Sequence, residues 1–432
     1  MSIHLGCARQ PESSSNDLTA PHQPAFQSRG PAKTQPLRLL QRDNSTKIDW
    51  STSRVDPQKL ARAIRLATSY LNQACKPSGQ FTYCVHQDAT QELKPEYNIL
   101  RHAGTLYALQ MSHDRSPDPR TREVLIRAAN FLQKETLAPL EKHPELFAIW
   151  SLPEMNHSGQ PAQAKLGGAG LGLVAFVRLE QLQPGFSKLE DLRGLASFIR
   201  SMQRPDGSFY SKYFRSTGRD ATWHSLYYPG EAALGLLNLY RMDADDRWLK
   251  AASAAMMFLA SSQEQSPSVR PDHWMLLAAT QLKPLLERDH SLESRASLMR
   301  HVRRTCKRMA EDQRPFLSNP QLRGCFVEDG RTTPTSIRLE GLLAALSILD
   351  ANDYRLEKQL DEVVAYGIQF LLRCQVQEGP FQGGIPCAIS FIPTGDEVDD
   401  AELKRRAGEI RIDYVQHALS AMIQYEARVT RE

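Results

Sequence analysis

The chain has 432 residues, of which 41% are hydrophobic and 24% are charged, which are ordinary values for a globular protein with a large apolar core. Its formal net charge is +4, from 53 basic and 49 acidic residues mixed along the chain, which excludes the basic stripe that nucleic-acid binding requires. No apolar run approaches the roughly 20 residues that cross a bilayer, so neither nucleic acid nor a membrane is a predicted partner.

The N-terminal segment 1–47 is rich in Pro, Ser, Gln and Asn and lacks helical periodicity, which predicts a disordered leader. It carries no apolar core of a signal peptide. The seven cysteines are scattered without a CxxC pair, a pattern typical of reduced thiols. We therefore expect a cytoplasmic protein with one folded domain over 48–432.

Six amphipathic segments with apolar residues at helical spacing follow the leader. The first begins with Asp56 as a predicted N-cap and Pro57 at the first helical position, both favoured at helix starts. Each has one apolar and one charged face, which indicates a helix on the surface of the domain. The six segments are 56–74, 121–134, 189–203, 247–260, 292–309 and 356–374.

Between these surface helices lie six segments that are apolar almost all round and rich in Gly and Ala. They begin at residues 97, 165, 227, 272, 335 and 413, and the second reads KLGGAGLGLVAFVRL. A helix without a polar face must be buried. Strict alternation of surface and buried helices predicts an all-α fold, an (α/α)6 toroid of six helical hairpins, with an inner ring of buried helices and an outer ring of amphipathic ones.

The connections from surface to buried helices share a pattern of Gln, then Gly, then an aromatic residue. It occurs in NQACKPSGQF, SMQRPDGSFY and RCQVQEGPFQGG. These turns and the alternating helices resemble the six-hairpin toroid superfamily, which includes glycoside hydrolases, uronate lyases, sugar epimerases and, more distantly, terpene cyclases. The resemblance runs from about Asp56 to the C-terminus and implies a saccharide-active enzyme.

Loop lengths indicate which end of the toroid carries function. Connections from buried to surface helices are short, such as 241–246 and 350–355, whereas the opposite connections include the long segments 135–164 and 375–410. Long ordered loops in a compact domain are commonly functional. We therefore expect the site at the N-terminal ends of the inner helices.

Ionisable and polar side chains gather at these predicted helix starts. Buried charges must pair with each other, line water or contact a ligand, so inter-helix ion pairs of Arg101, Arg338 or Arg411 with Glu231, Glu340 or Asp413 are the structural alternative. The catalytic candidates are Glu231, Asp272, Glu340, Asp413, His102, His273 and His417. The candidates for substrate binding are Tyr97, Asn98, Arg101, Lys165, His224, Tyr228, Arg338 and Arg411.

Two chemistries remain open for this set. A pair of carboxylates across a cavity can act as acid and base in glycoside hydrolysis, and a His or Tyr can remove the proton beside a sugar carboxylate, as in lyases and epimerases. The inner-helix dipoles and the cations favour an anionic sugar or sugar polymer. The alternative class is a non-catalytic or peptide-modifying toroid that binds an acidic ligand or a partner's tail.

No cofactor or metal is predicted. A metal at His273 would need help from Asp272, His224 or His102, and a lone His near a helix start is more often hydrogen-bonded structure. Asp243-Ala-Asp245-Asp246 resembles the proton donor of class II terpene cyclases. It lies in a short turn at the end opposite the expected site, so we interpret it as structural.

Overall fold

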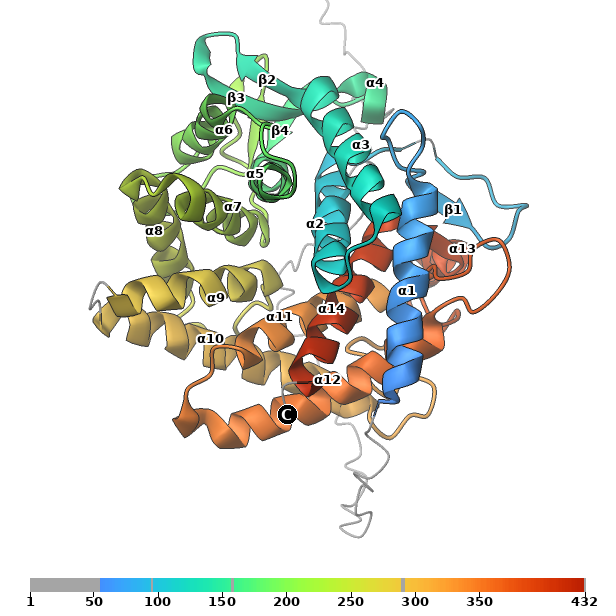
Figure 1. Cartoon of the computed structure of the whole chain (residues 1–432). Coiled ribbons are helices and arrows are strands. Elements are labelled where there is room, and N and C mark those ends of the chain that lie inside the picture. The colour runs from blue at the N-terminus through green and yellow to red at the C-terminus, as the bar shows by residue number, and fades with distance from the viewer. Residues whose placement is uncertain (1–54, 95, 157–158, 289–291, 431–432) are drawn as a thin grey trace, which may run out of the picture.

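Six helices form a closed inner ring in the computed structural model of the protein, which describes residues 55–94, 96–156, 159–288 and 292–430 (Figure 1). Each inner helix contacts the next along the chain, and the last contacts the first. They are α2 (Ile99–Arg115), α5 (Leu166–Leu182), α7 (Tyr228–Asp243), α9 (His273–Arg288), α11 (Thr332–Leu346) and α14 (Ile412–Val429). The predicted ring of buried helices is confirmed.

Six further helices surround this ring, and each precedes an inner helix in the chain. They are α1 (Pro57–Ala74), α3 (Pro119–Thr136), α6 (Leu189–Ser201), α8 (Asp246–Ser262), α10 (Leu292–Gln313) and α12 (Tyr354–Cys374). The start of α1 is as predicted, since the Asp56 side chain accepts hydrogen bonds from the backbone N–H groups of Gln58 and Lys59. The all-α toroid of six hairpins is therefore the fold, with bounds within a few residues of the expected ones.

Short strands occupy the connections that lead into the inner helices, and the sequence did not predict them. One sheet has the order β2-β3-β4-β5-β6 and the other pairs β1 with β7, all antiparallel. The strands are β1 (Cys84–His86), β2 (Leu137–Leu140), β3 (His143–Ser151), β4 (Gln163–Lys165), β5 (Lys212–Phe214), β6 (Gly218–Arg219) and β7 (Glu409–Arg411). Both sheets therefore lie at the end of the toroid where the inner helices begin.

Shorter helices complete the described chain. They are α4 (Pro153–Asn156), α13 (Glu397–Arg406) and the 3₁₀ turns η2 (Arg314–Phe316) and η3 (Ala351–Asp353). None of the described helices combines the length and the hydropathy that a membrane crossing needs. The predicted leader 1–47 lies outside the described residues.

The Gln-Gly-aromatic turns join neighbouring outer helices. In two of them, and in a further turn after α10 that the sequence pattern did not identify, a Gln amide at the end of one outer helix donates both to a glycine carbonyl of the turn and to a carbonyl of the next outer helix. The three sets are Gln203 with Gly207 and Ala251, Gln313 with Gly324 and Val363, and Gln375 with Gly383 and Ala63. The last set links α12 to α1 and so closes the outer ring.

These turns require glycine for two reasons. Gly383 has φ of 89°, and a Cβ there would lie 2.1 Å from the Leu66 carbonyl oxygen of α1. The left-handed region favours glycine, and the close approach leaves no room for a side chain. Glycine in this turn, here two residues after the aromatic Phe381, therefore allows α12 and its turn to pack closely against α1.

Candidate active site

Two histidines and a glutamate from three inner helices meet at the N-terminal end of the ring. His273 begins α9, Glu340 lies on α11, and His417 lies on α14. Glu340 Oε2 is 2.6 Å from His417 Nδ1 and 3.7 Å from His273 Nε2. The two imidazole rings are in edge-to-face contact, with centroids 5.5 Å apart. Three of the predicted catalytic candidates therefore form one cluster.

His273 is a buried imidazole that has no hydrogen-bond partner among the described residues. Its side chain is 2% exposed, and neither Nδ1 nor Nε2 makes a hydrogen bond to this part of the chain. Burial, and then the charges of His417, Arg101 and Arg338, hold the pKa of His273 well below its ordinary value of 6.5. At neutral pH it is therefore an uncharged base with a free ring nitrogen.

His417 is oriented by Glu340. A carboxylate oxygen only accepts hydrogen bonds, so the 2.6 Å contact places a proton on His417 Nδ1. The second ring nitrogen, Nε2, is then left to exchange a proton with a ligand. Glu340 Oε1 is buried and makes no hydrogen bond in the described structure, so this carboxylate also has capacity for a ligand hydroxyl.

Asp413 is held between two arginines. Arg411 donates to both of its carboxylate oxygens, at 3.0 and 2.8 Å, and Arg101 Nε lies 3.5 Å from Asp413 Oδ2. Burial acts to raise the pKa of Asp413, but the charges of Arg411 and Arg101 outweigh it and lower the value to about 2. Asp413 is thus a permanent anion, and this is the expected ion pairing with Arg101 and Arg411.

Arg101 is only partly satisfied by that contact. The Nε atom is buried and has no hydrogen-bond partner in the part of the chain that the structure describes, while 16% of the side chain is exposed. Asp413 is already engaged by Arg411 through two hydrogen bonds. Arg101 can therefore present its guanidinium to a ligand while Asp413 on its other side neutralises its charge.

Glu231 and Asp272 form a second pair of buried carboxyl groups. Burial raises the pKa of Glu231 to about 8, against the charge of Arg101 and with help from Asp272. Burial likewise raises the pKa of Asp272 to about 7, although the backbone N–H groups of Met275 and Trp274 oppose it. Glu231 Oε2 and Asp272 Oδ2 make no hydrogen bonds in the described structure. Glu231 is therefore a protonated carboxylic acid near neutral pH.

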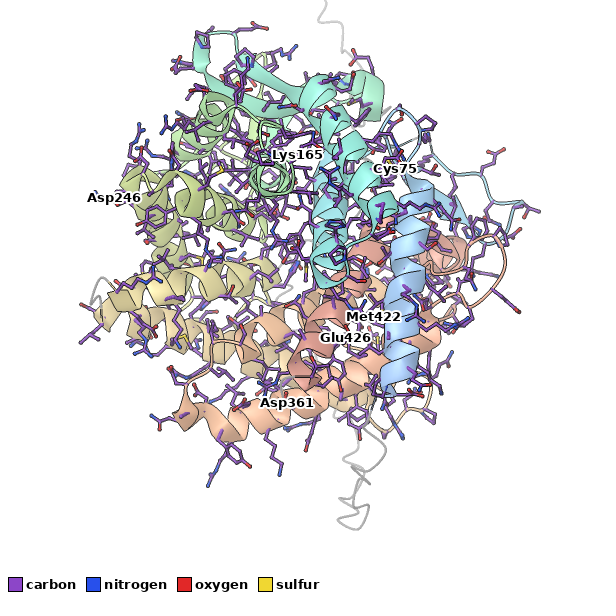
Figure 2. All side chains as sticks on the ribbon, in the orientation of Figure 1. Cys75, Lys165, Asp246, Asp361, Met422 and Glu426 are labelled. Atoms are coloured by element: carbon purple, nitrogen blue, oxygen red, sulfur yellow. The ribbon has the colours of Figure 1, made fainter. Side chains whose placement is uncertain are left out.

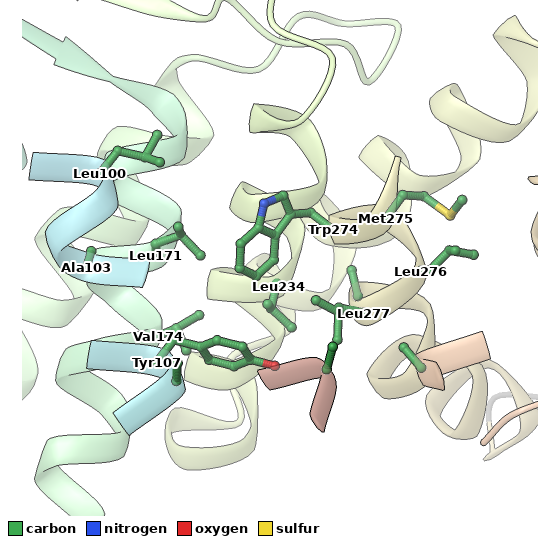
Figure 3. Close-up of a cluster of buried hydrophobic side chains, with 14 of the residues drawn as sticks. Leu100, Ala103, Tyr107, Leu171, Val174, Leu234, Trp274, Met275, Leu276 and Leu277 are labelled. Carbon is green, nitrogen blue, oxygen red and sulfur yellow. The ribbon is translucent and has the colours of Figure 1, made fainter. Parts of the chain in front are cut away.

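Buried hydrophobic side chains of the inner helices pack together (Figure 3) and reach the polar cluster at Trp274, whose ring centroid lies 4.9 Å from that of His273. Leu171 of α5 and Trp274 of α9 face each other there, and Tyr107 packs on Trp274 at a centroid distance of 5.8 Å. One turn before Leu171, Gly168 is buried, yet a Cβ at that position would meet no atom within 4 Å. A small open space therefore lies beside Gly168, on the face of α5 that carries Leu171.

Aromatic and basic residues stand around the cluster. Tyr227 packs edge-on against His273, at a centroid distance of 5.2 Å, and burial raises its pKa to about 12. Tyr228 packs on Trp223 at 5.6 Å, and burial raises its pKa also. Lys165 lies at the start of α5 (Figure 2). These residues supply stacking surfaces and positive charge.

His102 and Tyr97 belong to a separate network. His102 Nε2 donates to the Ala128 carbonyl at 2.9 Å, and its Nδ1 accepts from the Tyr97 hydroxyl at 2.7 Å. The Tyr97 oxygen in turn accepts from the Phe81 N–H. Both ring nitrogens of His102 are thus occupied, so the structure assigns it to the packing of α2 against α3 and does not bring it to the cluster.

The remaining candidates divide in the same way. Asn98 caps α2 by accepting from Leu100 N–H, and His224 is exposed. Arg338 pairs with Asp312 of α10 at 3.4 Å, because its side chain extends toward the outer ring. It therefore does not form the alternative ion pair with Glu231, Glu340 or Asp413. The Asp243 carboxylate is held by Arg193 and by Trp248 Nε1, as a structural turn requires.

The cluster could also hold a metal ion. One ligand atom from each of His273, Glu340 and His417 lies within 4.8 Å of the others, and two imidazoles with a carboxylate are a donor set that zinc accepts. From the sequence, only Asp272, His224 or His102 were candidates to share a metal with His273, and not Glu340 and His417. Lys212 and Gly168 were not singled out either, because nothing local in the sequence indicates their positions at the site.

Solved structures of other proteins share the fold of this chain, whereas sequence comparisons find no match. No protein-family model matches the chain, and no curated protein sequence matches it. Solved structures do match over most of its length, and they are (α/α)6 toroids of sugar-active enzymes.

Three neighbours illustrate the likeness. Cellobiose 2-epimerase from Bacillus thermoamylovorans has a TM-score of 0.60 and 10% identity, covering 86% of this chain and 99% of its own. D-mannose isomerase has a TM-score of 0.56 and 11% identity, with 86% and 98% covered. An α-1,6-mannanase from Salegentibacter has a TM-score of 0.52 and 12% identity, with 86% and 99% covered. The shared property is the fold.

Proposed function

We propose that this protein is a sugar isomerase or epimerase that moves a proton at the carbon beside the carbonyl of an open-chain sugar. The observation that carries the proposal is His273, a neutral, buried imidazole beside a second imidazole, whose two nitrogens make no hydrogen bond within the described residues. Proton removal next to a carbonyl needs a base that is unprotonated at the working pH, which a neutral imidazole satisfies. The neighbouring epimerase and isomerase structures support the same class.

The chain's own residues divide the work as follows. One imidazole of the His273 and His417 pair takes the proton from C2, and the electrons of the broken C–H bond form the C1–C2 double bond of an enediolate. Arg101 stabilises the negative charge on oxygen, and Glu340 orients His417. The imidazolium formed in the first step then returns its proton. Addition to the opposite face of C2, after the sugar has turned over in the site, gives the epimer. Addition to C1, with transfer of the O2 proton to O1, gives the ketose.

Glycoside hydrolysis is the second candidate, and the state of Glu231 favours it. A carboxyl group with a pKa of about 8 can serve as a general acid at neutral pH, and one solved neighbour is a mannanase. The partner carboxylate would be Asp272, one oxygen of which already accepts from Met275 N–H at 3.1 Å. Asp413 is unsuited because two arginines engage it.

Proton exchange with solvent tests the first candidate. Incubating the protein in D₂O with mannose, glucose, fructose, cellobiose or α-1,6-mannobiose, followed by NMR, should reveal deuterium at C2 or C1 of one sugar. The H273N and H417N variants should each lower the rate by about 10² to 10⁴, the usual contribution of a positioned acid or base. H301N is the matched control, since His301 is equally buried but lies on the outer helix α10.

The same samples separate the two candidates. Release of mannose from the disaccharide, unaffected by H273N but abolished by E231Q, would replace the proposal by the hydrolase. Exchange that survives both histidine substitutions would refute the proposal outright. Chelator-sensitive exchange would assign the histidines to a metal and remove them as bases.

A further inference from the structure

Two lysines face each other directly at the entrance to α5. Lys165 of β4 and Lys212 of β5 are partners in antiparallel register, and like charges in opposed positions destabilise a sheet. Lys165 is also the N-cap residue of α5 and makes no capping hydrogen bond. The arrangement therefore costs stability without contributing to the helix start.

Lys165 lies among cations. Burial, and then the charges of Lys212 and Arg101, lower its pKa from 10.5 to about 8, and no acidic side chain of the described residues forms an ion pair with it. Lys212 is better placed, with its ammonium 4.2 Å over the Trp223 ring and close enough to Asp220 to lower the pKa of that carboxyl. The uncompensated charge is thus that of Lys165.

The space that a ligand needs lies on the same face of the helix. Gly168 follows Lys165 by three residues, which places it one turn further along that face. The position is buried, and a Cβ atom at Gly168 would have no atom from another part of the described protein within 4 Å. The carboxyl group of Glu231 lies against the first turn of α5 at the neighbouring Gly167. Because this carboxyl is largely protonated near neutral pH, it supplies little negative charge to balance Lys165.

We propose that Lys165, with Arg101 and Lys212 beside it, binds an anionic substituent of the sugar, a phosphate or a carboxylate, in the open space beside Gly168. The inference rests on the proposed function for the reacting end of the sugar, and it adds the substrate class. The positive end of the α5 dipole acts in the same direction as the lysine. The anion supplies the counter-charge that the described residues around Lys165 do not.

Calorimetric binding of mannose, mannose 6-phosphate, mannuronate and inorganic phosphate tests the inference, with wild type, K165M, K165R and K188M. Lys188 is the matched control, because it too is an N-cap residue without a capping side-chain bond, but it is exposed on the outer helix α6. The phosphate and carboxylate arms identify which anion is preferred. Thermal melting confirms folding, and K165M should melt no lower than wild type because it removes the opposed charge.

K165M should weaken binding of the preferred anionic sugar by about tenfold or more, equal to about 1.4 kcal/mol, and should weaken binding of mannose by a smaller factor. K165R should recover part of the loss, and K188M should match wild type. Equal affinity of folded K165M and wild type for all three anionic ligands would overturn the inference. The inference would also be overturned if the wild-type protein bound the anionic ligands no more tightly than mannose.

The outcome is separable from that of the proposed function. Lys165-dependent binding without deuterium exchange in that sugar would keep the anion site and discard the isomerase. Exchange in a neutral sugar that K165M leaves unchanged, with no anion preference, would keep the isomerase and discard the anion site.

Discussion

Replacing Glu231 with glutamine should make the protein less sensitive to alkaline pH. The pKa of Glu231 is raised from an ordinary 4.5 to about 8, chiefly by burial. A carboxyl whose pKa is raised on folding contributes its full stability below the unfolded value and loses it as the pH rises toward the folded value. The wild type therefore weakens across this window, whereas glutamine, an uncharged copy of the acid, does not titrate.

The magnitude follows from linkage. Each pH unit within the window costs about 1.4 kcal/mol, so raising the pH from 6 to 9 should cost the wild type about 2 to 3 kcal/mol more than the variant. For a domain of this size the difference in melting temperature between E231Q and wild type should grow by about 3 °C. Asp272 titrates in both proteins, so its contribution largely cancels.

Thermal melts in matched buffers at each pH measure this difference. The control is E397Q, since Glu397 is exposed on α13 and its replacement should give a constant difference. A flat profile for E231Q, or one that falls with pH, would refute the assignment of a protonated, desolvated acid at the site.

Five other substitutions test the packing of the site and of the outer ring. Gly168→Ala should raise the melting temperature by removing a helical glycine, worth up to about 1 kcal/mol, and Gly168→Leu should block sugar binding in a folded protein. By contrast, Gly167→Ala should lower the stability by about 1 to 3 kcal/mol through overpacking, because its Cβ would lie 1.8 Å from Glu231 Oε2. His102→Gln should lower stability by about 1 to 3 kcal/mol through its lost hydrogen bonds and should leave deuterium exchange intact. Loss of exchange in the folded variant would show that His102 takes part in the reaction. Gln375→Ala should cost a similar amount in unfolding experiments, because it opens the link between α12 and α1, whereas an unchanged unfolding midpoint would show that the link is dispensable.

The fold could be predicted because both of its signals are local. Amphipathic and fully apolar segments alternate with helical period, and a helix that is apolar all round, such as α5, has only the interior in which to lie. The Gln-Gly-aromatic turns repeat because each joins one outer helix to the next. The short strands escaped prediction because three-residue segments such as β4 and β5 are stabilised by partners far away in the sequence.

The contents of the site were only partly predictable. Both His102 and His273 lie at or near the start of an apolar helix, yet one is hydrogen-bonded to the outer ring and the other faces the cluster. Rotation of each helix about its axis decides this, and a helix that is apolar on all sides carries no pattern that fixes its rotation. The contact of Glu340 with His417 and the ion pair of Arg338 with Asp312 could not be predicted for the same reason, because both depend on how the helices are rotated.

A crystal structure with a bound linear hexitol would test the central claim most directly, because a hexitol has the length and hydroxyl pattern of the open-chain sugar. We expect its first two carbons beside the His273 and His417 rings, with a hydroxyl within hydrogen-bonding distance of Arg101. A metal ion on His273, Glu340 and His417, or a hexitol bound elsewhere while this cluster stays closed, would contradict the account.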